Sequence, residues 1–94
     1  MEAAPLILKL AQEAQLRLDA LFSVGDPTSG GPLDQAGLRD GLKIVEEYVS
    51  HGELEVAFEH LLYMVREPGL ALSESERANI IRVSQFLKLP TPLG

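Results

Sequence analysis

Apolar residues recur every three or four positions along most of this chain, which is the spacing of α-helices that bury one face. The first stripe lies between Leu6 and Phe22 and consists of Ile7, Leu10, Ala11, Ala14, Leu18 and Leu21. Further apolar residues widen this stripe, namely Leu6, Leu8, Leu16 and Phe22. We therefore predict a first helix that is covered on more than one side, either by its own bundle or by a second copy of the chain.

A linker and then a second helix are predicted next. Residues 23–33 hold three glycines and two prolines, which disfavour a helix and indicate a long connector. The second helix is predicted to begin at Asp34, as its N-cap, and to end at about Ser50. Two glycines in its first turns weaken a helix by about 1 kcal/mol each relative to alanine, so a start near Asp40 remains an alternative. Its buried stripe consists of Leu38, Leu42, Val45 and Val49, with Tyr48 at the border.

A short turn separates the second helix from the third. In Ser50-His51-Gly52 the glycine is expected to adopt the left-handed conformation that ends many helices. The third helix is predicted from Glu53 to about Arg66. Its buried stripe is the most regular of the chain and consists of Leu54, Ala57, Phe58, Leu61, Leu62 and Val65. Because the joining turn is so short, the two helices are expected to form an antiparallel hairpin.

A fourth helix follows a proline–glycine break. Glu67-Pro68-Gly69 ends the third helix, because proline forces the preceding residue out of helical geometry. Ser73 and Glu76 have the spacing of a capping box, so the fourth helix is predicted to start at Ser73 and to end near Lys88. Its inner residues are Ile80, Val83, Ser84 and Leu87, flanked by Ile81 and Phe86. The tail, residues 90–94, is expected to be extended and loosely held.

These elements predict an all-α fold, a single four-helix domain over residues 1–94 with a central antiparallel helical hairpin. The chain of 94 residues, with 46% hydrophobic and 23% charged residues, has the size and composition of one globular domain. It has no cysteine, which excludes disulfides, thiolate metal sites and a thiol nucleophile.

Charge and hydropathy limit the kinds of binding partner and the cellular locations that we expect for this protein. Fourteen acids against eight bases give a net charge of −6, which argues against binding to nucleic acid. Glu2 stands where an export signal needs positive charge, and Lys9 interrupts the following apolar stretch. No run of 18 apolar residues is present, so we expect no membrane association and a cytoplasmic location.

Few residues offer catalytic chemistry. His51, Glu55 and Glu59 could share a metal ion, but histidines and carboxylates at helical spacing are common on solvated faces. The serines are better explained as caps and turn residues than as nucleophiles. The pair Gly30-Gly31 lacks the lysine and the strand-to-helix context of a phosphate loop. We therefore expect a protein that is not an enzyme, with no catalytic residues, metal or cofactor.

The distribution of charge is more informative than its total. Residues 46–76 hold eight acids and one base, a net −7, whereas the rest of the chain holds six acids and seven bases, a net +1. Two interpretations are open: a face that confers solubility, or a docking surface for a basic partner. Under the second, the expected partner-binding residues are Glu46, Glu47, Tyr48, His51, Glu53, Glu55, Glu59 and Tyr63. The two tyrosines would be anchors or lie at the core margin, and His51 would contact the partner or cap the second helix.

Three segments together resemble the small helical immunity proteins of the Maf type, which accompany bacterial polymorphic and contact-dependent toxins. The segments are residues 45–61, 72–76 and 86–89, about half of the chain. They carry an acidic helix ending in Tyr-x-x-His-Gly-Glu, an Ala-x-Glu-x-Leu helix, a Leu-Ser-x-x-Glu cap and a closing Leu-x-Leu. The matching residues are Tyr48, His51, Gly52, Glu53, Ala57, Glu59, Leu61, Leu72, Ser73, Glu76, Leu87 and Leu89.

The resemblance implies that the protein binds one cognate toxin domain, often a nuclease, inside the producing cell and blocks it without catalysis. The charge pattern is compatible with this, because a nuclease that holds phosphates is basic. The alternative is a helical-hairpin adaptor, or a module that forms a homodimer through the apolar stripe of its first helix.

Overall fold

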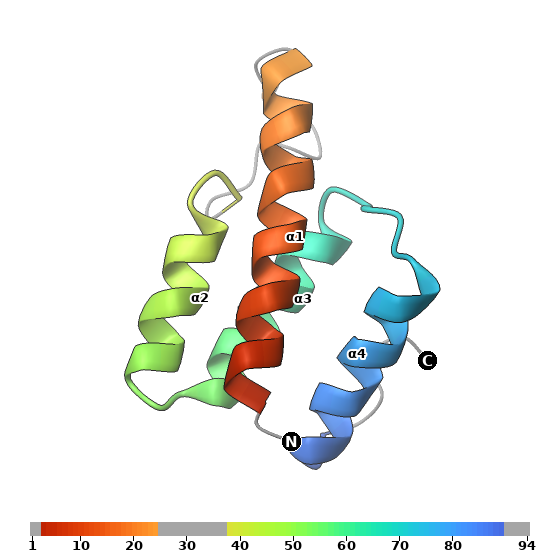
Figure 1. Cartoon of the computed structure of the whole chain (residues 1–94). Coiled ribbons are helices and arrows are strands. Elements are labelled where there is room, and N and C mark those ends of the chain that lie inside the picture. Colours follow the sequence, from red (N-terminus) through yellow and green to blue (C-terminus); the bar gives the residue numbers. More distant parts are fainter. Residues whose placement is uncertain (1–2, 25–37, 90–94) are drawn as a thin grey trace.

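The computed structural model describes residues 3–24 and 38–89, and in these residues it is all α-helix without a β-strand (Figure 1). The predicted fold class is confirmed. The four helices of the described residues are α1 (Ala3–Val24), α2 (Gly41–Ser50), α3 (Leu54–Arg66) and α4 (Glu74–Phe86). The predicted Asp34 cap, the tail at 90–94 and most of the predicted linker lie outside the described residues.

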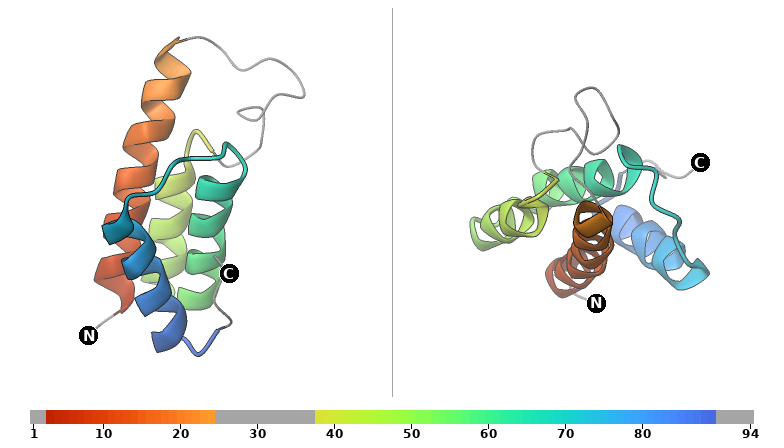
Figure 2. Two further views of the ribbon diagram at one scale, coloured as in Figure 1. Left: turned by 90° about the vertical axis from the view of Figure 1, so that its right-hand side faces the viewer. Right: turned by 90° about the horizontal axis from the view of Figure 1, so that it is seen from above.

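Helix α1 lies at the centre of the bundle. It contacts α2, α3 and α4, while α2 and α3 pack side by side as the predicted antiparallel hairpin (Figure 2). The predicted apolar stripes meet around α1 in one core, whose buried hydrophobic members are Ala3, Ile7, Leu10, Ala11, Ala14, Leu18, Leu38, Val45, Ala57, Phe58, Leu61, Met64, Val65, Ile80 and Val83. One apolar face from each helix is therefore removed from water, which is the main stabilising contribution in a domain of this size.

Helix α1 differs from its prediction at both ends. It begins at Ala3, because Pro5 in the first turn costs no intrahelical hydrogen bond, and it continues through Ser23 and Val24. Those two residues therefore belong to the helix and not to the linker. Leu21 is 40% exposed instead of buried, since the C-terminal end of α1 projects past the other helices (Figure 1).

The start of α2 agrees with the later of the two predicted positions. Asp40 occupies the N-cap of α2, but its side chain makes no capping hydrogen bond. The cap comes from α1 instead: Gln15 Oε1 accepts the Leu42 backbone N–H at 2.9 Å, and Gln15 Nε2 donates to the Leu38 carbonyl at 3.2 Å. A buried glutamine of one helix thus satisfies the free N-terminal N–H of another.

The turn between α2 and α3 has the predicted geometry. Gly52 has φ +73°, its N–H donates to the Val49 carbonyl at 3.0 Å, and the Glu53 N–H donates to the Tyr48 carbonyl at 2.9 Å. This pair of bonds is a Schellman motif, which satisfies carbonyls at the end of α2. His51 caps α2 through its backbone N–H, which donates to carbonyl groups in the last turn of the helix. The left-handed glycine predicted from sequence is confirmed.

Helices α2 and α3 approach closely at Gly41. A Cβ atom at this position would lie only 2.7 Å from the Sδ and Cε atoms of Met64, which is fully buried. The glycine that weakens the helix locally therefore makes room for a core side chain of α3. Met64 extends the predicted stripe of α3, which did not include it.

The predicted capping box opens α4 and is joined to α1. The Ser73 N–H donates to Glu76 Oε1 at 2.8 Å, and the Glu76 N–H donates to Ser73 Oγ at 3.1 Å. Arg17 reaches the same carboxylate oxygen at 2.5 Å and the Ala71 carbonyl at 2.8 Å. Burial opposes ionisation of Glu76, but the bonds from Ser73 and the Arg17 charge outweigh it and lower the pKa of this carboxyl.

Candidate functional site

Glutamates cover the outer side of the α2–α3 hairpin and the start of α4. Seven of the eight acids between residues 46 and 76 are exposed, and the eighth, Glu76, is buried and paired with Arg17. The exposed acids are Glu46, Glu47, Glu53, Glu55, Glu59, Glu67 and Glu74. The negative charge predicted for this segment is therefore almost entirely at the surface.

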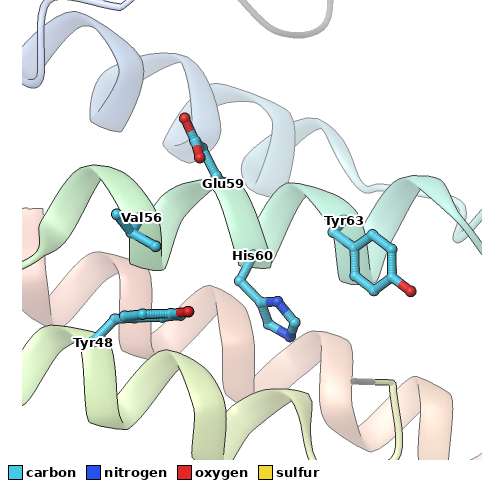
Figure 3. A pocket seen from close by; sticks show the side chains of 5 residues that line it. All are labelled: Tyr48, Val56, Glu59, His60 and Tyr63. Carbon is cyan, nitrogen blue, oxygen red and sulfur yellow. The ribbon is translucent and has the colours of Figure 1, made fainter. Parts of the chain in front are cut away.

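A shallow hollow of about 270 Å³ lies on this outer side between α2 and α3 (Figure 3). Tyr48 contributes from α2, and the remaining lining residues, Val56, Glu59, His60 and Tyr63, come from α3. They share one side of the helix because they recur at spacings of three and four. We call this hollow the tyrosine hollow.

Aromatic rings line most of the tyrosine hollow. Tyr48 runs between α2 and α3 with its hydroxyl group toward His60, and Val56 and His60 leave α3 on the side that faces α2 (Figure 3). The rings of His60 and Tyr63 lie 5.4 Å apart between centroids with an angle of 34° between planes, so they pack together. The carboxylate of Glu59 points away from Tyr48 (Figure 3). The hollow therefore has an aromatic floor with a carboxylate at its rim.

A second hollow, of about 410 Å³, adjoins the first at the hairpin turn. Val56 lines both hollows and is 39% exposed. The other lining residues of the second hollow are Gly52, Glu53, Leu54, Glu55 and Leu87, the last of them from the end of α4. We call the two hollows together the α3 face. Among the described residues, its charged lining residues are the three glutamates Glu53, Glu55 and Glu59, and neither lysine nor arginine lines it.

The structure separates the predicted binding residues into two groups. Tyr48, Glu53, Glu55, Glu59 and Tyr63 meet on the α3 face. The other three, Glu46, Glu47 and His51, are exposed but line neither hollow.

Helical geometry explains why the two neighbouring glutamates differ. A residue advances by about 100° around the helix axis, so Glu47 points about 100° and Glu46 about 200° from Tyr48. Glu46 therefore lies on the opposite side of α2 from the tyrosine hollow.

Five lining residues of the α3 face were not among the predicted binding residues, namely Gly52, Leu54, Val56, His60 and Leu87. His60 is half-buried against Tyr63. The spacing Val56, His60, Tyr63 was a signal for Val56 and His60, since residues four and three apart on a helix are neighbours. Leu87 reaches the α3 face from another helix, so no local spacing could have found it.

The α3 face has the features of a binding surface. It combines aliphatic and aromatic contact area with negative charge at its edge, which is the usual arrangement of protein interfaces. The serine hydroxyls near it make bonds to the backbone: Ser50 donates to the Glu47 carbonyl and Ser84 to the Ile81 carbonyl. Within residues 3–24 and 38–89, no three histidine or acidic side chains gather in a way that could hold a metal ion.

Comparisons of the chain with known protein families, with curated proteins and with solved structures find no match. Among the described helices, not one has the length and apolar content that a bilayer crossing requires.

Proposed function

We propose that this protein is a binding protein whose α3 face docks onto a basic protein surface. We further propose that the partner is a bacterial toxin domain with nuclease activity and that this protein is its immunity protein. The observation that carries the proposal is the α3 face itself, in which exposed glutamates lie around exposed Val56 and half-buried apolar and aromatic side chains. The resemblance of residues 45–61, 72–76 and 86–89 to Maf-type immunity proteins supplies the class of partner.

Electrostatics supports this choice of partner. A nuclease carries positive charge where it holds phosphates, so its cleft attracts a face lined by Glu53, Glu55 and Glu59. Complementary charges accelerate the encounter of the two proteins and disfavour partners with an acidic surface. Apolar contacts at the centre of the interface slow dissociation of the complex. Occupation of such a cleft blocks the substrate without any chemistry by this chain.

The experiment uses the protein encoded beside this chain's gene. Its C-terminal domain is produced in bacterial host cells with and without the full chain, and the growth of these cells is measured. The association rate of the two purified proteins is then measured at low and at high salt. We expect protection, and an association rate that falls steeply with salt. No complex and no protection would refute the proposal.

Two charge-reversal variants test whether the α3 face is the surface that binds the partner. Glu59→Lys and Glu46→Lys change the net charge equally and both alter exposed helical glutamates, but only Glu59 lines the α3 face. We expect Glu59→Lys to slow association on the order of tenfold and Glu46→Lys to have a much smaller effect. Equal effects would mean that only the total charge matters and that the α3 face is not the docking surface.

Self-association through α1 remains a second candidate because of one observation. Leu16 is 71% exposed and Leu21 is 40% exposed on this helix, whereas Leu10 is buried in the core. Sedimentation of the isolated chain tests it: a dimer that is lost in Leu16→Glu would favour self-association. Leu10→Glu is unsuitable as a test, because it places a charge in the core and disrupts folding.

A further inference from the structure

We propose that the tyrosine hollow receives one arginine side chain of the basic partner. This inference rests on the proposed function and adds the chemical group that the hollow recognises, a guanidinium. It concerns the part of the α3 face that Tyr48, Val56, Glu59, His60 and Tyr63 form between α2 and α3 (Figure 3).

The size of the hollow fits one side chain of a protein partner. Its volume of about 270 Å³ is below the range of about 300–1,000 Å³ that is typical of small-molecule pockets, and the hollow is shallow. A free small ligand would keep much of its surface in water there, so it is expected to bind weakly and to saturate the hollow only at high concentration. A long side chain that is held in place by the surrounding interface needs no deep pocket, because the neighbouring contacts position it.

The lining selects a cation with a flat face. Tyr48 approaches from α2, and the tilted ring pair of His60 and Tyr63 lies along α3, so aromatic rings come from both sides of the hollow. Cations are attracted to the electron-rich faces of aromatic rings, and a planar guanidinium can also stack on them. A lysine ammonium is a compact and strongly hydrated charge, so it gains less from the same rings. The lining therefore favours arginine over lysine.

Negative charge at the rim adds to this preference. Glu59 is exposed and points away from Tyr48, so a change of its side-chain rotamer is needed to bring its carboxylate over the hollow (Figure 3). Rotamer changes of this kind are common when interfaces form. A guanidinium lying on the rings can then donate two parallel hydrogen bonds to the carboxylate, which an ammonium cannot do. Val56 packs against the aliphatic part of the arginine side chain.

The test is a titration of the full chain with N-acetyl-arginine amide and, separately, with N-acetyl-lysine amide, followed by NMR of the aromatic ring signals. Both probes carry one positive charge and differ in the group that bears it. We expect the arginine probe to shift the Tyr48, His60 and Tyr63 ring signals in a saturable way and to bind at least about threefold more tightly than the lysine probe. Equal binding of the two probes, or ring signals that do not shift in a saturable way with the arginine probe, would overturn the inference.

Matched variants of Tyr48 test whether its aromatic ring is required for binding of the arginine probe. Tyr48→Phe keeps the ring and is expected to bind the arginine probe as the unaltered chain does, whereas Tyr48→Leu is expected to lose the shifts at His60 and Tyr63. If Tyr48→Leu does not fold, Tyr63→Leu provides the same comparison from α3. Unchanged binding in a folded leucine variant would contradict the inference.

The proposed function and this inference can fail separately. If Glu59→Lys slows association with the neighbouring gene product as expected and Tyr48→Leu leaves the affinity unchanged, the docking surface is right and the arginine site is wrong. If the arginine probe binds as expected but no complex forms with that protein, the hollow recognises a guanidinium and the proposed toxin partner is wrong.

Discussion

Replacing Arg17 by methionine should destabilise the fold by removing the link between α1 and α4. The change keeps the aliphatic part of the side chain and deletes two interactions, the ion pair with Glu76 and the hydrogen bond to the Ala71 carbonyl. Exposed ion pairs contribute about 0.2–1 kcal/mol, whereas breaking a fully buried pair costs about 3–5 kcal/mol. This pair is intermediate, since the Arg17 side chain is 38% exposed and that of Glu76 only 7%.

The expected loss of stability lies between the values for exposed and for fully buried ion pairs, and nearer to the value for exposed pairs. After the replacement Glu76 still accepts the Ser73 N–H, so its buried carboxylate keeps one partner. We expect a decrease of about 1–2 kcal/mol in the free energy of unfolding, which lowers the Tm of a domain of this size by about 5–15 °C. Thermal unfolding followed by circular dichroism at 222 nm measures this directly.

The loss should also depend on pH. Because the pKa of Glu76 is lowered in the folded state, ionised Glu76 stabilises the fold at neutral pH, and this contribution disappears as the pH falls through that pKa. The difference in Tm between Arg17→Met and the unaltered chain should therefore be largest near pH 7 and shrink under acidic conditions. Glu76→Gln, which can keep the cap through its amide oxygen, should remove this pH dependence.

Arg82→Met is the matched control, because it deletes an exposed arginine of α4. We expect it to change Tm by no more than a few degrees. Equal losses in Arg17→Met and Arg82→Met, or a loss in Arg17→Met that does not vary with pH, would refute the reasoning about the buried pair.

Three further predictions concern the hairpin and its attachment to α1. Gln15→Leu should cost about 1–3 kcal/mol in urea unfolding and should speed hydrogen exchange at the Leu42 amide, which loses its acceptor; unchanged exchange there would contradict the cap. Gly52→Val should cost about 1–2 kcal/mol, and Gly52→Asn clearly less, because apart from the two chain neighbours no atom of the described residues lies within 4 Å of the added Cβ, so the penalty comes from the positive φ; identical midpoints for the two variants would argue against it. Gly41→Ala should destabilise despite its better helix propensity, because the methyl group meets Met64, and a double-mutant cycle with Met64→Val should give a coupling above about 0.5 kcal/mol.

Local features of this protein were readable from its sequence. The helices follow from apolar spacing, the turn at Gly52 from a glycine after a helix, and the capping box from Ser73 and Glu76, all of which depend on residues within a few positions of one another. The same holds for part of the candidate site, since Glu59 and Tyr63 are four apart on one exposed side of α3. Short-range interactions of this kind have the same partners in any compact arrangement of the helices.

The tertiary structure decided what depends on the packing of one helix against another. The start of α2 relies on Gln15, which is 27 residues before the N–H that it caps. One acid of the negative segment is withdrawn from the surface because Arg17 lies 59 residues away in sequence and next to it in space. Likewise Tyr48 and His60 meet in one hollow only because α2 lies along α3. Contacts between segments far apart in sequence leave no periodic signal in either segment, so only the packed bundle shows them.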